Sequence, residues 1–262
     1  MQTIKTVVIA GVVIVAVMLL ISVLSGCSSS AGSDSSKKDS NAYSSKDDTK
    51  DSGSDTSKTG STGSDGSFPL YGTGACPPAD GASKPKIDFD AAPKKCIDPS
   101  KTYTATVKTS EGTVVLKLDT KRTPATVNNF VVLARYGYFD DTVFFRTEAQ
   151  SGIIQGGSPH TQDNTDAGPG YNIADEGVPF SSDDYAPGTI AMANTGQPNS
   201  GSAQFFFLAN EGGRYLGDAQ QVGPSAGSYA VFGTATKGLD VLEKIAALDD
   251  GTSVPSKKVT IE

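Results

Sequence analysis

A low-complexity stretch, residues 28–67, limits where this chain of 262 residues can build a core. It consists almost entirely of Ser, Gly, Asp, Lys and Thr, and Tyr43 is its only large apolar residue. A segment of this composition cannot bury enough apolar surface to offset the entropy that ordering costs. We therefore expect a disordered tether, which at random-coil scaling spans roughly 35 Å on average, followed by one domain of ordinary size.

Residues 1–27 resemble a bacterial lipoprotein signal. Lys5 supplies a positive end, an almost continuously apolar run occupies 7–24, and small residues lead to Cys27. Small residues before a Cys at the end of an apolar run are similar to a lipobox, which implies cleavage before Cys27 and its acylation. This predicts export and a lipid anchor at the outer face of the bacterial cytoplasmic membrane. An uncleaved membrane helix is the alternative, because the run is about long enough to span a bilayer.

The Pro-rich segment 68–101 is expected to be extended, and it carries Cys76 and Cys96. Once Cys27 is lipidated, these two cysteines remain in a chain that is predicted to be exported. A disulfide between them is the natural interpretation. It would close a loop of about twenty residues and contribute roughly 3 kcal/mol. Two free thiols are the alternative.

Charge and metal-ligating residues exclude several classes of function. The net charge of −7 argues against a nucleic-acid or anionic-lipid surface. A structural zinc site needs about four His or Cys ligands, whereas the only histidine is His160 and the three cysteines are scattered. His160 follows a turn sequence at 157–159, so we expect a solvated loop histidine rather than a catalytic base. No metal or cofactor is expected.

From Tyr103 onward the sequence is typical of many short strands and two helices. The first helix is expected to open at Thr123, with the next residue, a proline, in its first turn, and to end at Gly137. The second is expected over 237–248. With no alternation of single strands and helices, a mostly antiparallel β-barrel within residues 102–262 is favoured. The expected strands are 103–109, 113–118, 142–146, 153–155, 188–193, 204–208, 229–233 and 259–261, and 213–217 is expected to be a loop.

Two polar residues lie inside apolar strand-like runs. Arg146 directly follows two phenylalanines, and Gln155 follows two isoleucines and precedes the pair Gly156-Gly157. Strands usually send Arg and Gln to solvent, yet both are flanked here by large apolar residues. We expect Arg146 and Gln155 to meet on one sheet face and hold a substrate. The alternative is a half-exposed arginine beside a bulge.

Three stretches taken together resemble the cyclophilin family of peptidyl-prolyl cis–trans isomerases. They are Phe-Phe-Arg to Gln-Gly-Gly at 144–157, Met-Ala-Asn to Gln-Phe-Phe at 192–206, and Val-Phe-Gly at 231–233. Their order and spacing are specific, and the resemblance covers 103–262. It implies a mainly β fold, an eight-stranded antiparallel β-barrel capped by two α-helices, which agrees with the strand pattern.

The resemblance also implies roles for individual positions. Arg146 matches the family's catalytic arginine, and Gln155 matches the glutamine that helps to hold it. The positions that match substrate-binding residues are Ala193, Asn194 and Gln204 for the peptide backbone, and Ile153, Phe206, Tyr215, Leu216 and Tyr229 for the proline pocket and its rim. The implied partners are proline-containing segments of exported proteins, no cofactor is implied, and a monomer is expected.

The chain departs from the family pattern in four places. Gly152 stands where Phe is usual, Ile153 where Met is usual, Tyr229 where His is usual, and Tyr215 where Trp is found in relatives that bind cyclosporin strongly. In addition, the spacing from the matched arginine to the matched glutamine is one residue longer. These departures predict a wider or partly filled pocket. The main hypothesis is a surface-anchored prolyl isomerase. Two alternatives stay open: a catalytically weak proline-peptide binding module or chaperone, and an adhesin that reuses the barrel.

Overall fold

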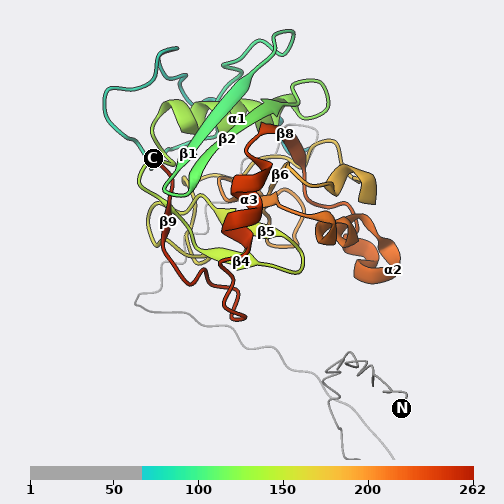
Figure 1. Ribbon diagram of the computed structural model, residues 1–262. Coiled ribbons are helices and arrows are strands. Elements are labelled where there is room, and N and C mark those ends of the chain that lie inside the picture. Colours follow the sequence, from blue (N-terminus) through green and yellow to red (C-terminus); the bar gives the residue numbers. More distant parts are fainter. Residues whose placement is uncertain (1–66) are drawn as a thin grey trace, which may run out of the picture. The chain divides into compact units, whose positions relative to one another are not determined.

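The structure, a computed structural model, describes residues 67–262 (Figure 1). The predicted signal, the predicted lipidation site Cys27 and all but the end of the predicted tether lie outside the described residues. Between residues 67 and 262, no helix combines the length and the apolar character that crossing a bilayer requires.

Seven antiparallel strands form one sheet in the order β1-β2-β8-β6-β7-β5-β4, and β3 pairs separately with β9. The mainly β, antiparallel character predicted from the sequence is therefore confirmed. A closed eight-stranded barrel stays a prediction. The strands are β1 Thr104–Thr109, β2 Gly112–Leu118, β3 Val143–Phe144, β4 Arg146–Glu148, β5 Ile153–Gly156, β6 Thr189–Met192, β7 Phe205–Leu208, β8 Val231–Lys237 and β9 Val259–Thr260.

The described α-helices are α1 Pro124–Arg135, the single turn α2 Ala219–Val222, and α3 Leu239–Ala246. α3 packs against β2, β4 and β5, and it runs across the front of the sheet in Figure 1. The segment 213–217, expected to be a loop, lies within a 3-10 helix, Glu211–Gly217. Leu239, expected on the core-facing side of the second helix, is 38% exposed, because it stands at the first helical position, before the turn that packs on the sheet.

An aromatic cluster fills the core between α1 and the sheet. The ring of Phe205 lies 5.8 Å from that of Phe130 in α1, 5.4 Å from Phe139 and 6.3 Å from Phe144, all edge to face. Because side chains alternate along a strand, β7 sends Phe205 into this cluster and the next residue, Phe206, to the opposite face. Phe205 thus fixes β7 in the aromatic cluster, and Phe206, which is also buried, lies on the other face of the strand.

The N-terminus of α1 is capped by a residue from a distant loop. Thr123 precedes the helix as predicted, but its hydroxyl donates to the carbonyl of Asp119 at 3.2 Å and caps no helical N–H. The buried carboxylate of Glu176 instead accepts from the backbone N–H groups of Ala125, at 3.0 Å, and Thr126, at 2.8 Å. A negative charge at this end also complements the helix dipole.

The segment 68–101 packs along α1 and contains the predicted disulfide between Cys76 and Cys96. The Ala82 N–H donates to the carbonyl of Arg135, the last residue of α1, at 2.7 Å, and the Lys86 N–H donates to the carbonyl of the next residue, Tyr136, at 2.9 Å. At its other end, the side chain of Asn128 accepts from the Cys96 N–H at 2.6 Å. We call residues 68–101 the disulfide segment.

Candidate active site

A groove of about 890 Å³ opens beside strands β4, β5 and β7. Every residue that the sequence predicted to be catalytic or substrate-binding lies in its wall, so the structure brings the whole predicted set together. Their individual roles stay predictions. These residues are Arg146, Ile153, Gln155, Ala193, Asn194, Gln204, Phe206, Tyr215, Leu216 and Tyr229.

Strand register aligns three of these residues in a row. Arg146 on β4 lies directly opposite Gln155 on β5, which lies opposite Phe206 on β7. The Arg146 Nη1 donates to Gln155 Oε1 at 2.9 Å, and Gln155 Nε2 donates to Gln204 Oε1 at 2.9 Å. Arg146 and Gln155 therefore meet on one face of the sheet in a regular ladder, without the bulge that was the alternative.

Beside the guanidinium lies an apolar slot. Its walls include Ile153, Phe206 and Leu216, each less than a tenth exposed. The ring of Tyr229 meets that of Phe206 edge to face, with centroids 5.3 Å apart. The hydroxyl of the buried Tyr185 fixes the backbone of Tyr229, since it donates to the Tyr229 carbonyl at 2.8 Å. The slot is thus lined by buried apolar side chains, the kind of surface that receives a small apolar ring.

Asn194, in the polar wall of the groove, is held by hydrogen bonds to two different loops. Asn194 donates from Nδ2 to the carbonyl of Ser228 at 3.0 Å, and its Oδ1 accepts from the Gly196 N–H at 2.9 Å. The Ala193 N–H donates to the Gln204 carbonyl at 2.9 Å. Both polar atoms of the Asn194 side chain are therefore engaged, one within its own loop and one by Ser228, 34 residues away, and together they hold this part of the wall in place.

Gly152 does not leave a hole in the groove. It adopts φ of +71°, and a Cβ built on it would lie 2.7 Å from the backbone nitrogen of Asn210. Its carbonyl accepts from the Ala209 N–H at 2.8 Å. Only glycine fits this turn between β4 and β5.

Two loops contribute groove residues that the sequence did not reveal. One supplies Asp163 and Asp166, and the other supplies Ser253 and the half-exposed Val254. The second loop is tied to β4, because the Thr147 N–H donates to the Ser253 carbonyl at 3.2 Å. No motif or periodicity marks these positions, since only tertiary packing brings the loops to the groove.

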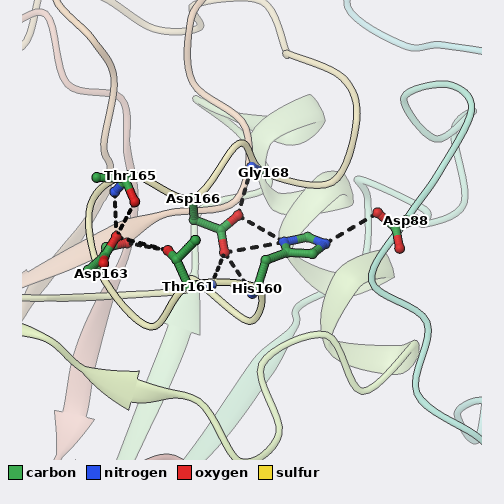
Figure 2. Close-up of polar contacts among 7 residues, drawn as sticks. All are labelled: Asp88, His160, Thr161, Asp163, Thr165, Asp166 and Gly168. Carbon is green, nitrogen blue, oxygen red and sulfur yellow. Dashed lines mark hydrogen bonds and ion pairs between the residues drawn. The ribbon is translucent and has the colours of Figure 1, made fainter.

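His160 connects the loop that carries Asp163 and Asp166 to the disulfide segment (Figure 2). Its Nδ1 lies 3.0 Å from the buried carboxylate of Asp166, and its Nε2 lies 3.2 Å from the exposed carboxylate of Asp88. Asp166 also accepts from the Gly168 N–H at 2.7 Å. His160 does lie in a loop, as predicted, but two carboxylates engage it and it does not line the groove.

The His160 contacts predict a stability that depends on pH. Burial alone would lower the pKa of His160, but the hydrogen bonds and charges of Asp166 and Asp88 outweigh burial and raise the pKa above its ordinary 6.5. The stabilisation is therefore complete below the ordinary value and is lost as pH rises through the higher folded value. We expect His160→Gln to lower the melting temperature more at pH 5.5 than at pH 8.5, by an amount corresponding to about 1 kcal/mol or less.

Thermal melts of the wild type and the His160→Gln variant at the two pH values measure this difference. Asp88→Asn serves as the control, because it removes only the exposed partner and should give a smaller shift of the same sign. An equal loss at both pH values would contradict the assignment of a protonated, paired imidazole.

Comparison with known proteins agrees with the geometry. The family profile described as cyclophilin type peptidyl-prolyl cis-trans isomerase/CLD matches residues 104–262. The peptidyl-prolyl cis-trans isomerase cyp18 of Streptomyces antibioticus is 37% identical over 166 residues, which are 61% of this chain and 95% of that relative. The peptidyl-prolyl cis-trans isomerase B of Escherichia coli is 32% identical over 166 residues, 60% of this chain and 95% of that relative.

A longer relative and a solved structure extend the comparison. The probable peptidyl-prolyl cis-trans isomerase B of Mycobacterium leprae is 36% identical over 208 residues, 71% of this chain and 63% of that relative. A crystal structure of a cyclophilin type peptidyl-prolyl cis-trans isomerase from Cryptosporidium parvum is similar in fold, with a TM-score of 0.50 and 25% identity over 62% of this chain and 94% of that one. Profile, relatives and fold agree, and this chain belongs to the cyclophilin type peptidyl-prolyl cis-trans isomerase family.

Proposed function

We propose that this cyclophilin isomerises X-Pro bonds in exported proteins while a lipid on Cys27 holds it at the outer face of the bacterial cytoplasmic membrane. The observation that carries the catalytic part is the guanidinium of Arg146, held by Gln155 beside the slot of Phe206 and Leu216. The Cys at the end of an apolar N-terminal run supports the anchoring part. Folding outside the cell can wait on X-Pro isomerisation, which takes tens of seconds without a catalyst.

The proposed mechanism requires no covalent step. Amide resonance opposes rotation of the X-Pro bond with a barrier of roughly 18–20 kcal/mol. In the twisted state the imide nitrogen loses conjugation and gains a lone pair, which a guanidinium binds better than it binds the planar imide. Arg146 supplies that selective stabilisation, because arginine stays charged and its planar fork can be held by Gln155. Phe206, Leu216 and Ile153 hold the proline ring while the bond rotates.

We also infer that the two sheets are parts of one closed barrel. On one side, Ser110 N donates to the Thr260 carbonyl at 3.0 Å and Glu262 N donates to the Lys108 carbonyl at 2.9 Å, which joins β9 to the β1–β2 hairpin. On the other side, only Phe145 separates β3 from β4. Counted as one bent strand, β3 and β4 bring the described total to eight, as the family resemblance implies.

The test of the catalytic proposal is an isomerisation assay on a proline-containing peptide with the full chain. Exchange spectroscopy by NMR measures both the binding of the peptide and the rate at which its cis and trans forms interconvert. Faster interconversion supports the proposal. Binding that leaves the interconversion rate unchanged would support a binding module instead.

The anchoring proposal predicts a modified N-terminus. We expect the purified wild-type chain to begin at Cys27, with a mass increased by its acyl chains, and to carry label from a radioactive fatty acid. In Cys27→Ser, the label should be absent and residues 1–26 retained, because the proposed processing depends on that cysteine. Intact-mass spectrometry of both proteins checks this. A wild-type chain that keeps residues 1–26 would support the uncleaved membrane helix.

A further inference from the structure

Glu148 binds the guanidinium of Arg146 from the side opposite Gln155. The two residues lie two positions apart on β4, so their side chains project from the same face of the strand. Glu148 Oε1 accepts from Arg146 Nε at 3.0 Å and makes a closer contact with Nη2. Glu148 Oε2 accepts from the hydroxyl of Ser151 at 2.8 Å. Both carboxylate oxygens are therefore engaged.

The donors of Arg146 show what this contact achieves. A guanidinium has five N–H donors in a rigid planar fork. Glu148 takes one on Nε and one on Nη2, and Gln155 takes one on Nη1. Two side chains thus hold the fork at two edges, and one N–H on each terminal nitrogen remains to bind a ligand of the groove that Arg146 lines. Since the Arg146 side chain is 38% exposed, it would have many orientations without these contacts.

Glu148 itself does not line the groove, and its hydrogen bonds to the groove wall are those to Arg146. Its charge nevertheless reaches the groove wall. The pKa of Tyr215 is raised, first by burial and then by the charge of Glu148, while Arg146 opposes the rise. The carboxylate, the guanidinium and Tyr215 are therefore electrostatic neighbours.

We propose that Glu148 is a positioning residue for isomerisation: it clamps the Nε–Nη2 edge of Arg146, and Ser151 holds the clamp in place. This inference rests on the proposed catalytic role of Arg146. The carboxylate also weakens the positive potential of the guanidinium, which opposes catalysis. Positioning dominates, because a fixed donor stabilises a transition state without reorganising during the reaction.

Enzyme kinetics on the full chain test the proposal. Glu148→Ala should lower kcat/KM about tenfold, mainly through kcat, since the slot that binds the proline ring is untouched. Glu148→Gln should retain most of the activity, because its amide oxygen can still accept from the guanidinium. Ser151→Ala should give a smaller loss than Glu148→Ala. The control is Asp183→Ala, which breaks another arginine–carboxylate pair, with Arg214, outside the groove wall and should leave the rate unchanged.

A double-mutant cycle separates positioning from a general structural effect. In an Arg146→Ala background, Glu148→Ala should cause no further loss, because the residue that it positions is absent. NMR supplies an independent measurement, in which the Arg146 Nε–H signal should be sharp in the wild type and in Glu148→Gln and broadened in Glu148→Ala.

Three results would overturn the proposal: a Glu148→Ala variant as fast as the wild type, a Glu148→Gln variant faster than the wild type, or an equal loss from Glu148→Ala with and without Arg146. The failure of the proposed function has a different signature, in which the wild type does not accelerate isomerisation or Arg146→Ala is fully active.

Discussion

Replacing Arg146 by alanine should lower kcat/KM for a proline-containing peptide by about 10²–10³-fold, the usual effect of deleting one preorganised donor that stabilises a transition state. Among residues 67–262, the guanidinium is the only cationic group in the wall of the groove. It stands beside the apolar slot and is held by Gln155 on one edge. Without it, the lone pair of the twisted imide nitrogen has no charged partner, so the barrier returns toward that of the free peptide.

Peptide binding should survive this substitution better than catalysis. The slot formed by Ile153, Phe206 and Leu216 does not depend on the arginine, so the affinity measured by NMR titration should change much less than the rate. Arg146→Lys should stay well below the wild type, because an ammonium keeps the charge but lacks the fork that Gln155 holds. Arg135→Ala, which removes an arginine outside the groove wall, is the control. A rate for Arg146→Ala within twofold of the wild type would rule out the proposed mechanism.

Removing the disulfide should lower the free energy of unfolding by about 3 kcal/mol. Cys76 and Cys96 are 20 residues apart, and a cross-link over a loop of this size restricts the unfolded chain by about that amount. The folded contacts near the bond do not require it. Asn128 still accepts from the Cys96 N–H, and Ala82 still donates to the carbonyl at the end of α1. For a domain of this size the loss corresponds to a fall of roughly 6–12 °C in melting temperature.

Calorimetry of the variant with both cysteines replaced by serine measures the effect. A reducing agent should lower the melting temperature of the wild type to a similar degree and leave the variant unchanged, which separates loss of the bond from the change of side chain. Isomerase activity at 25 °C should be retained, because no residue of the disulfide segment lines the groove. Equal melting temperatures with and without the bond would show that the unfolded chain is already restricted in this region.

The parts of the site that the sequence predicted are residues whose local sequence pattern lies within one strand. Arg146 and Gln155 each end an apolar run, and a regular antiparallel pairing of the two runs is enough to bring them together. The start of α1 was predicted for the same reason, because Thr123 and the proline after it are adjacent in the chain.

The parts that could not be predicted depend on partners far away in the sequence. Glu176 caps α1 from a loop about fifty residues downstream, and nothing near either site encodes that contact. Ser253 and Val254 reach the groove because β4 holds their loop. The single turn α2 is too short for a hydrophobic period to reveal it.

The row of Arg146, Gln155 and Phe206 has a consequence for how proteins of this kind can diverge. Because the ladder of three strands sets the spacing of the row, a change of length in the turn between β4 and β5 would leave Arg146, Gln155 and Phe206 side by side. We therefore expect length changes in this turn to reshape the rim of the groove and to leave the row itself in place.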